Sequence, residues 1–183
     1  MRITGGAARG IILKVPRYEM RPTTDRVREA IFSILASSGS SWSRCLDLYA
    51  GTGALGIEAL SRDAEWVDFV DQEPRCCAII KQNLEKAGFE QKSHVFCRSV
   101  SKTLAFLGNA YDIIFMDPPY SDTNAETILM QLDNSRLLTA TSLVIFPHAT
   151  RSPVAEAYGN LRLIKERRHG DTSIAIFARE SEK

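Results

Sequence analysis

The sequence predicts an α/β fold in which helices cover both faces of a mostly parallel, doubly wound sheet. From residue 44 onward, short apolar segments typical of buried strands alternate with segments of helical period. A glycine-rich loop joins the first such strand to the helix after it, which is typical of doubly wound sheets. The chain closes with two strand-like segments around Gly170-Asp171, which predict a terminal antiparallel hairpin.

A basic extension, residues 1–40, is expected to precede the main domain, residues 41–183. Two short strands with glycine-containing turn residues between them predict a small β-hairpin at Arg2–Thr4 and Ile11–Val15. A helix follows, because Thr24 or Asp25 can cap it and apolar residues recur at three- and four-residue spacing. The Ser/Gly run at 37–41 ends this helix and joins the extension to the main domain.

The main domain is predicted to hold a seven-stranded sheet. Apolar runs bounded by turn residues predict strands at Cys45–Tyr49, Trp66–Asp71, His94–Cys97, Asp112–Met116, Ser142–Pro147, 161–167 and 172–179. Helical segments are predicted at 53–62, Pro74–Ala87, 124–133 and Pro153–Tyr158. Pro74 at the start and Gly88 just past the end make the second of these helices the best defined.

Composition excludes several classes of protein. The 183 residues are 44% hydrophobic and 25% charged, which are globular averages and exclude wholesale disorder. No apolar run approaches the roughly 20 residues that a membrane span needs, and the start of the chain lacks the apolar core of a signal peptide. The four cysteines and three histidines show no ligand spacing, so no metal site is predicted. We expect a cytoplasmic protein without a membrane partner.

The near-neutral net charge of +1 hides an asymmetry. Residues 1–28 hold seven basic and two acidic side chains, a net of +5. The other 155 residues hold 16 basic and 20 acidic side chains, a net of −4. A basic segment ahead of an acidic body indicates that a polyanion docks there, although a solvated loop has the same charge pattern.

The loop after the first strand fits the pattern G-x-G-x-x-G at Gly51, Gly53 and Gly56. Asp71 ends the second strand 20 residues after Gly51, where a carboxylate binds the ribose hydroxyls of a nucleotide. The pattern alone therefore leaves a dinucleotide such as NAD or FAD possible.

Charge favours a different cofactor. Asp47 stands at the carboxyl end of the first strand, and a pyrophosphate beside this carboxylate is unfavourable. S-adenosylmethionine carries a sulfonium and an ammonium group and no phosphate, so an acidic pocket suits it. Glu58, in the helix after the loop, is a further candidate cofactor ligand, although an acid near a helix start is also favoured by the helix dipole.

The segment Asp117-Pro118-Pro119-Tyr120 follows the apolar strand ending at Met116 and is the most specific motif in the chain. Its two prolines fix the backbone, so the Asp117 carboxylate and the Pro118 carbonyl can form a rigid pair of acceptors. Such a pair suits the two N–H donors of an exocyclic amine and orients the nitrogen lone pair for methyl transfer. Tyr120 offers a flat face for a flipped base.

Together these motifs resemble the class I amino-methyltransferases, and in particular the RsmD-type bacterial 16S rRNA (guanine-N2)-methyltransferases. The resemblance spans nearly the whole chain. It rests on Arg2–Gly6, Arg9-Gly10, Arg21-Pro22-Thr23, Arg28–Phe32, Leu46–Arg62, Asp117–Tyr120 and His169–Thr172.

The resemblance implies methylation of one guanine amine in 16S rRNA with S-adenosylmethionine as the methyl donor. The partner would be the small ribosomal subunit or its assembly intermediate, and we expect a monomeric enzyme. The implied catalytic residues are Asp117, Pro118, Pro119 and Tyr120, and the cofactor-binding ones are Asp47, Tyr49, Gly51, Gly53, Glu58, Asp71 and Ser99. The RNA-binding candidates are Arg2, Arg9, Arg21, Thr23 and Arg26.

A second basic cluster lies on the last hairpin, at Arg162, Lys165, Arg167 and Arg168. It adds phosphate contacts if it shares a face with the basic extension, and is otherwise a solvated strand.

Three other functions remain open from the sequence: an amino-methyltransferase acting on adenine N6 in DNA or on a glutamine side chain, a dinucleotide-dependent oxidoreductase, and a catalytically inactive RNA-binding module. Asp at position 117, rather than Asn, disfavours the first, and the intact tetrapeptide disfavours the last.

Overall fold

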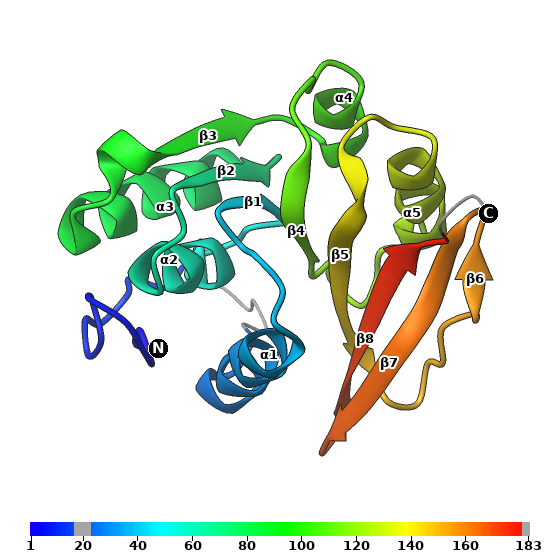
Figure 1. Cartoon of the computed structure of the whole chain (residues 1–183). Helices are drawn as coiled ribbons and strands as arrows, with labels where there is room; N and C mark the ends of the chain where they lie inside the picture. Colours follow the sequence, from blue (N-terminus) through cyan, green and yellow to red (C-terminus); the bar gives the residue numbers. More distant parts are fainter. Residues whose placement is uncertain (17–22, 181–183) are drawn as a thin grey trace.

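The computed structural model describes residues 1–16 and 23–180, and its centre is one mixed sheet of eight strands (Figure 1). The strand order is β3-β2-β1-β4-β5-β8-β7-β6. The parallel strands are β1 (Arg44–Leu48), β2 (Trp66–Asp71), β3 (Ser93–Cys97), β4 (Tyr111–Met116) and β5 (Leu138–Ala149). The antiparallel strands are β6 (Ala157–Tyr158), β7 (Leu161–His169) and β8 (Thr172–Arg179). The predicted doubly wound sheet with a terminal hairpin is confirmed, with one strand more than expected.

Helices cover both faces of this sheet. They are α1 (Asp25–Ser38), α2 (Ala54–Ser61), α3 (Pro74–Ala87), α4 (Val100–Leu104) and α5 (Ala125–Asp133), with a 3-10 turn at Glu90–Lys92. The apolar side chains of α1, α2 and α3 share one core with alternate residues of the strands, such as Ile113 and Phe115. Their neighbours Ile114 and Met116 point to the other face, where α4 and α5 pack.

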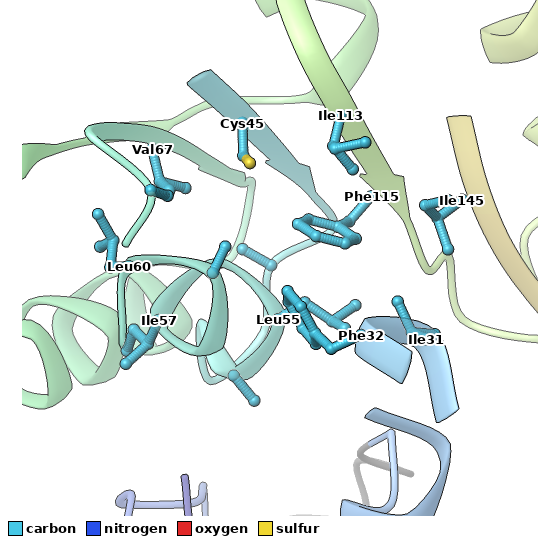
Figure 2. Close-up of a cluster of buried hydrophobic side chains, with 14 of the residues drawn as sticks. Ile31, Phe32, Cys45, Leu55, Ile57, Leu60, Val67, Ile113, Phe115 and Ile145 are labelled. Atoms are coloured by element: carbon cyan, nitrogen blue, oxygen red, sulfur yellow. The ribbon is translucent and has the colours of Figure 1, made fainter. Parts of the chain in front are cut away.

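The core under α1 and α2 is the one that supports the glycine loop (Figure 2). Phe32 of α1 contacts Phe115 of β4, with ring centroids 5.7 Å apart. Leu55 and Ile57 of α2 are buried in the same cluster. These contacts hold α1 beside the strands that end at the site, so the helix of the extension belongs to the main core.

Strand β1 is the point at which the winding of the sheet reverses. Its neighbours are β2 on one side and β4 on the other, so the chain leaves the centre of the sheet in both directions. Ligands of open α/β sheets bind outside the carboxyl ends of the strands at such a point. Asp47 in β1, Asp71 in β2 and Asp117 after β4 lie at this edge.

The predicted N-terminal hairpin is present, because the Ile3 N–H donates to the Ile11 carbonyl at 2.9 Å and the Leu13 N–H donates to the Met1 carbonyl at 3.0 Å, but the predicted extent of its two strands is wrong. Residues 1–16 form only one isolated antiparallel bridge, between Arg2 and Ile12. The backbone also bonds to the main domain: the Ala7 N–H donates to the Ser61 carbonyl at 2.7 Å, and the Lys14 N–H donates to Asn83 Oδ1 at 2.7 Å. Because these partners lie on α2 and α3, the short hairpin is attached to the helices of the main domain.

The predicted helix at Pro153–Tyr158 is also wrong. Only Ala157–Tyr158 is regular, as the short strand β6 paired with β7. The Leu163 N–H donates to the Glu156 carbonyl at 2.8 Å, and Gly159 takes a left-handed φ of 64° in the turn between the strands. This pairing is a local hairpin, with the two-residue turn Gly159-Asn160 between its strands, and it adds the eighth strand.

In residues 1–16 and 23–180, none of the helices has both the length and the apolar character needed to span a membrane.

Candidate active site

A cavity of about 440 Å³ lies at the carboxyl ends of β1, β2 and β4. The N-terminus of α1 closes one side of it, and the adjoining ends of β5 and β8 contribute Pro147 and Thr172. Among the predicted site residues, the cavity wall contains Thr23, Asp47, Tyr49, Gly51, Asp71, Asp117, Pro118, Pro119 and Tyr120. The sheet therefore brings the glycine loop, the strand-end carboxylates and the tetrapeptide to one cavity.

The glycine loop turns sharply at the end of β1. Tyr49, Gly51 and Gly53 all have positive φ, at 57°, 59° and 77°. The Gly53 N–H donates to the Ala50 carbonyl at 2.7 Å, which closes the turn before α2 begins. Gly53 itself is not part of the cavity wall, but its neighbours Thr52 and Ala54 are. The left-handed backbone at Gly51 and Gly53 explains the choice of glycine.

Two aspartates hold this loop in place. Asp71 Oδ2 accepts a hydrogen bond from the Gly51 N–H at 2.8 Å, and Asp47 Oδ2 accepts one from the Gly56 N–H at 2.9 Å. Burial raises the pKa of both carboxyls, and for Asp47 the nearby Asp117 and Asp71 raise it further. A bound cation would therefore stabilise the ionised forms of both carboxyl groups.

Gly56 has a packing role. A Cβ at this position would lie 2.3 Å from the Phe69 ring and 2.8 Å from Val67. The missing side chain lets α2 approach β2 closely, as the third glycine of such loops does.

The cavity wall is acidic. It includes Asp47, Asp71, Glu73 and Asp117, and the part of the wall that the structure describes has no Lys, Arg or His. A phosphate-bearing cofactor would meet four carboxylates and no described counter-charge. The donor set and the charge fit S-adenosylmethionine, whose sulfonium and ammonium groups are cationic.

Asp117 follows β4 directly, and Thr23 of the N-terminal extension donates a hydrogen bond from its hydroxyl to Asp117 Oδ2. Loss of solvent raises the pKa of Asp117 to about 6, and the Thr23 hydrogen bond opposes this rise. Pro118 is buried, whereas Tyr120 is 50% exposed at the cavity. The tetrapeptide therefore combines a buried proline, Pro118, with an accessible tyrosine ring, Tyr120.

Tyr49 lines the cavity beside this motif. Its burial and the nearby Asp122 raise the pKa of the phenol, so it stays neutral and offers an uncharged surface to a ligand.

Glu58 is placed differently from the prediction. It is fully buried and does not reach the cavity. Its carboxylate accepts hydrogen bonds from the backbone N–H groups of Thr4 and Gly5, at 2.9 and 2.8 Å, and from Arg62 Nε at 3.0 Å. We therefore assign Glu58 to the attachment of the N-terminal segment rather than to the cofactor.

Sequence reasoning missed the buried Arg28, which connects Glu58 to the site. Its side chain is fully buried, with Nε 3.8 Å from Glu58 Oε2, and its Nη1 donates to the Thr23 carbonyl at 2.9 Å. A lone Arg on an amphipathic helix is ordinarily exposed, so the sequence contains no sign of this role.

The remaining predicted residues lie outside the cavity wall. Ser99 is the N-cap of α4, and its neighbour Val100 lines the cavity instead. Arg2 and Arg26 are exposed near the start of α1, with Arg2 Nε 4.0 Å from Asp25. Arg9 is exposed in the turn that packs near Ser61, at the far end of α2. Arg21 lies outside the described residues.

Sequence reasoning also missed several wall residues. They are Thr24, Glu73, Cys76, Pro147 and Thr172. Pro147 and Thr172 come from an antiparallel strand pair, and their approach to β1 depends on the strand order, which no local motif specifies.

The strand order, the glycine loop at the switch point and the acidic cavity define a Rossmann-like, S-adenosylmethionine-dependent methyltransferase. Residues 1–178 match the model of a family described as Conserved hypothetical protein 95, and the chain belongs to this family.

Named relatives agree with this class. Ribosomal RNA small subunit methyltransferase D of Escherichia coli (strain K12) is 32% identical over 185 residues, covering 100% of this chain and 91% of the relative. The protein of the same name from Haemophilus influenzae is 34% identical over 182 residues, covering 97% and 93%. The solved structure of the Escherichia coli protein yhhF superposes with a TM-score of 0.87 at 30% identity, covering 100% of this chain and 99% of that one. The resemblance to RsmD-type methyltransferases is confirmed.

Proposed function

We propose that this enzyme transfers a methyl group from S-adenosylmethionine to the exocyclic N2 amine of a guanine in 16S rRNA. The observation that supports it most is the placement of the Asp117 tetrapeptide in an acidic cavity behind the glycine loop. The relatives that cover the whole chain are named for methylation of small-subunit rRNA, which supports the substrate.

The cofactor site is assigned to the glycine loop and the strand-end carboxylates. Asp71 is positioned for the ribose hydroxyls, Asp47 for the ammonium group, and Gly51 for close backbone approach. Tyr49 packs beside them, and Gly53 closes the turn. When bound, S-adenosylmethionine supplies an electrophilic methyl group on a sulfonium.

Asp117 and the Pro118 carbonyl act as the acceptors of the target amine. Thr23 occupies Asp117 Oδ2, so Oδ1 remains for one amine N–H. Two acceptors that hold both N–H groups leave the nitrogen lone pair directed at the methyl group, and positioning supplies most of the rate. With a pKa of about 6, Asp117 is ionised at neutral pH and can take up the proton that the amine loses after attack.

Tyr120 provides the surface on which the flipped guanine stacks. Its ring is half exposed at the cavity, so a base can cover it without moving the backbone. Pro119 lies between this ring and the buried Pro118 and limits the freedom of the turn.

The substrate is the small ribosomal subunit or its assembly intermediate, which places the enzyme in the cytoplasm, and we expect it to act as a monomer. Arg2 and Arg26 are exposed beside the N-terminus of α1, whose Thr24 lines the cavity, and are available to RNA phosphates.

The test is methyl transfer to small subunits purified from cells that lack this gene, with labelled S-adenosylmethionine. We expect label in 16S rRNA, and we expect an Asp117→Ala variant to lose at least about 100-fold in rate while it still binds the cofactor. Calorimetry with S-adenosylmethionine and NADH serves as the cofactor control. Tight NADH binding without S-adenosylmethionine binding, or full activity of the Asp117→Ala variant, would contradict the proposal.

A further inference from the structure

The arginines of β7 lie toward opposite ends of the strand, and Lys165 lies between them. Arg162 begins the strand and pairs with Ala178, near the end of β8. Arg167 and Arg168 lie near the end of β7, opposite Ile174 and Ser173 at the start of β8. Arg162 and Arg167 are five positions apart along the strand, which corresponds to about 17 Å.

The end of β7 that holds Arg167 and Arg168 borders the cavity. Strand β5 runs parallel to β4, so its end lies at the ligand-binding edge, and its residue Pro147 is part of the cavity wall. Strand β8 begins at the same place, where Thr172 pairs with Ala149 and also lines the cavity. The turn between β7 and β8 therefore extends past the cavity, on the same side of the sheet as α1 (Figure 1).

We define the hairpin tip as Arg151, Arg167 and Arg168. All three side chains are exposed. Arg168 Nε donates to the Gly170 carbonyl at 3.0 Å, which leaves its terminal nitrogens available, and Arg151 follows β5 in the adjoining turn. Arg162, by contrast, is paired with Glu180 at 3.0 Å.

Acidic groups near the tip offset only part of this charge. Glu166 accepts a hydrogen bond from His148 Nε2 at 2.8 Å, so its carboxylate is engaged. Asp171 is exposed in the turn itself. Three arginines against Glu166 and Asp171 leave an excess of one positive charge beside a cavity whose described wall is acidic. Positive charge at this place does not favour a cationic cofactor, whereas it does favour an anionic ligand.

We propose that the hairpin tip is a docking surface for RNA phosphates that flank the target nucleotide. The proposal rests on the proposed function, and it adds a second contact surface across the cavity from α1. A guanine that enters the cavity from a strand bound at the tip keeps its neighbouring phosphates outside, next to the arginines. Arginine matches this partner because its planar donors bind phosphate oxygens in pairs.

The test compares two doubly substituted proteins that lose the same charge. Arg167→Gln with Arg168→Gln removes the tip charge. Arg136→Gln with Arg162→Gln is the matched control, because Arg136 is exposed before the start of β5 and Arg162 begins β7, both at the opposite end of the sheet. Binding to small subunits from cells lacking the gene is measured between 50 and 300 mM KCl, together with cofactor binding and methyl transfer.

We expect the tip variant to bind subunits at least about tenfold more weakly than wild type at low salt. The slope of its log affinity against log salt should be smaller in magnitude by about 1.5, because two phosphate contacts are lost. Its cofactor affinity should stay within twofold of wild type, and the control should match wild type in both measurements. Equal binding by the tip and control variants would overturn the inference. Weaker binding with an unchanged salt slope would also overturn it, because it would indicate a ribosomal protein as the partner. If the wild type neither binds nor methylates subunits, the proposed function fails instead.

Discussion

The Thr23 hydroxyl donates a hydrogen bond to Oδ2 of Asp117, and this contact joins the N-terminal extension to the tetrapeptide. Arg28 holds the Thr23 carbonyl through Nη1 at 2.9 Å, and Arg28 lies beside the buried Glu58 of α2. A short series of contacts therefore links the helix after the glycine loop to the proposed acceptor of the amine.

This contact predicts a change in pH dependence. Activity needs the ionised Asp117 carboxylate, so the rate should fall as pH drops through about 6. The Thr23 hydrogen bond favours the ionised form, because it lowers the pKa of Asp117. Thr23→Val should therefore move the acid limb upward by about 0.5–1 pH unit, since a hydrogen bond contributes about 1 kcal/mol. The measurement is kcat against pH from 5 to 9.

Thr23→Ser is the control for this experiment because it keeps the hydroxyl, and its profile should follow wild type. An acid limb at the same pH in the Val and wild-type proteins would contradict the role assigned to Thr23.

Asp117 should reduce stability while it supports activity. Its folded pKa of about 6 exceeds the ordinary value of 3.8, so the folded state binds the proton more tightly. The favourable contribution of the protonated Asp117 carboxyl to the free energy of unfolding is fully present below pH 3.8 and is lost as pH rises to about 6. At pH 7, Asp117→Asn should thus raise the free energy of unfolding by about 1–3 kcal/mol and abolish most methyl transfer.

Urea unfolding at pH 7 and pH 4 checks this prediction. The increase in the free energy of unfolding caused by Asp117→Asn should be smaller at pH 4 than at pH 7. A variant less stable than wild type at pH 7 would show that the carboxylate is stabilised by the fold.

Much of the fold is predictable because its causes are local. The apolar run at Ile113–Met116 and the two prolines after it specify a buried strand and its end. The caps are local as well, since the Thr24 hydroxyl accepts from the Val27 N–H and Gly39 ends α1 with a left-handed φ. The strand-end residues Asp47, Asp71 and Asp117 follow from the same patterns and line one cavity.

One of the errors has a long-range cause and the other a local one. Glu58 fits a cofactor ligand by its place in the sequence, but its partners Thr4 and Gly5 lie more than 50 residues away. The segment before β7 has helical periodicity, but its pairing with β7 determines its conformation. The Glu58 contacts have no local pattern that would identify them, whereas Gly159-Asn160 is a two-residue hairpin signal that the helical interpretation overlooked.

The buried position of Glu58 predicts a large loss of stability upon neutralisation. Glu58→Gln leaves the buried Arg28 with Asp25 as its remaining acidic partner and weakens the bonds to Thr4 and Gly5. We expect the free energy of unfolding to fall by about 3–5 kcal/mol, as when one partner of a buried pair is removed. Glu65→Gln is the matched control, because Glu65 is exposed just before β2, and should change stability by less than about 0.5 kcal/mol. Equal stability of the two variants in urea would rule out this attachment.

Gly56 should be needed for packing. In Gly56→Ala the new methyl group would lie 2.3 Å from the Phe69 ring, so the helix or the ring must move. We expect a loss of about 1–3 kcal/mol in the free energy of unfolding and cofactor binding within a few fold of wild type in the folded protein.

Gly108→Ala is the control, since nothing lies within 4 Å of a Cβ there. A stable Gly56→Ala protein that fails to bind cofactor would instead assign Gly56 to the cofactor site.

The central claim is that a guanine amine of 16S rRNA receives the methyl group at the cavity formed by Asp117 and the glycine loop. The most direct measurement is mass spectrometry of nucleosides from small subunits of cells lacking this gene, treated with the purified enzyme and S-adenosylmethionine. We expect one new N2-methylguanosine per 16S rRNA, absent when the Asp117→Ala enzyme is used. A methyl group found on adenine or on a ribosomal protein, or no methyl group at all, would contradict it.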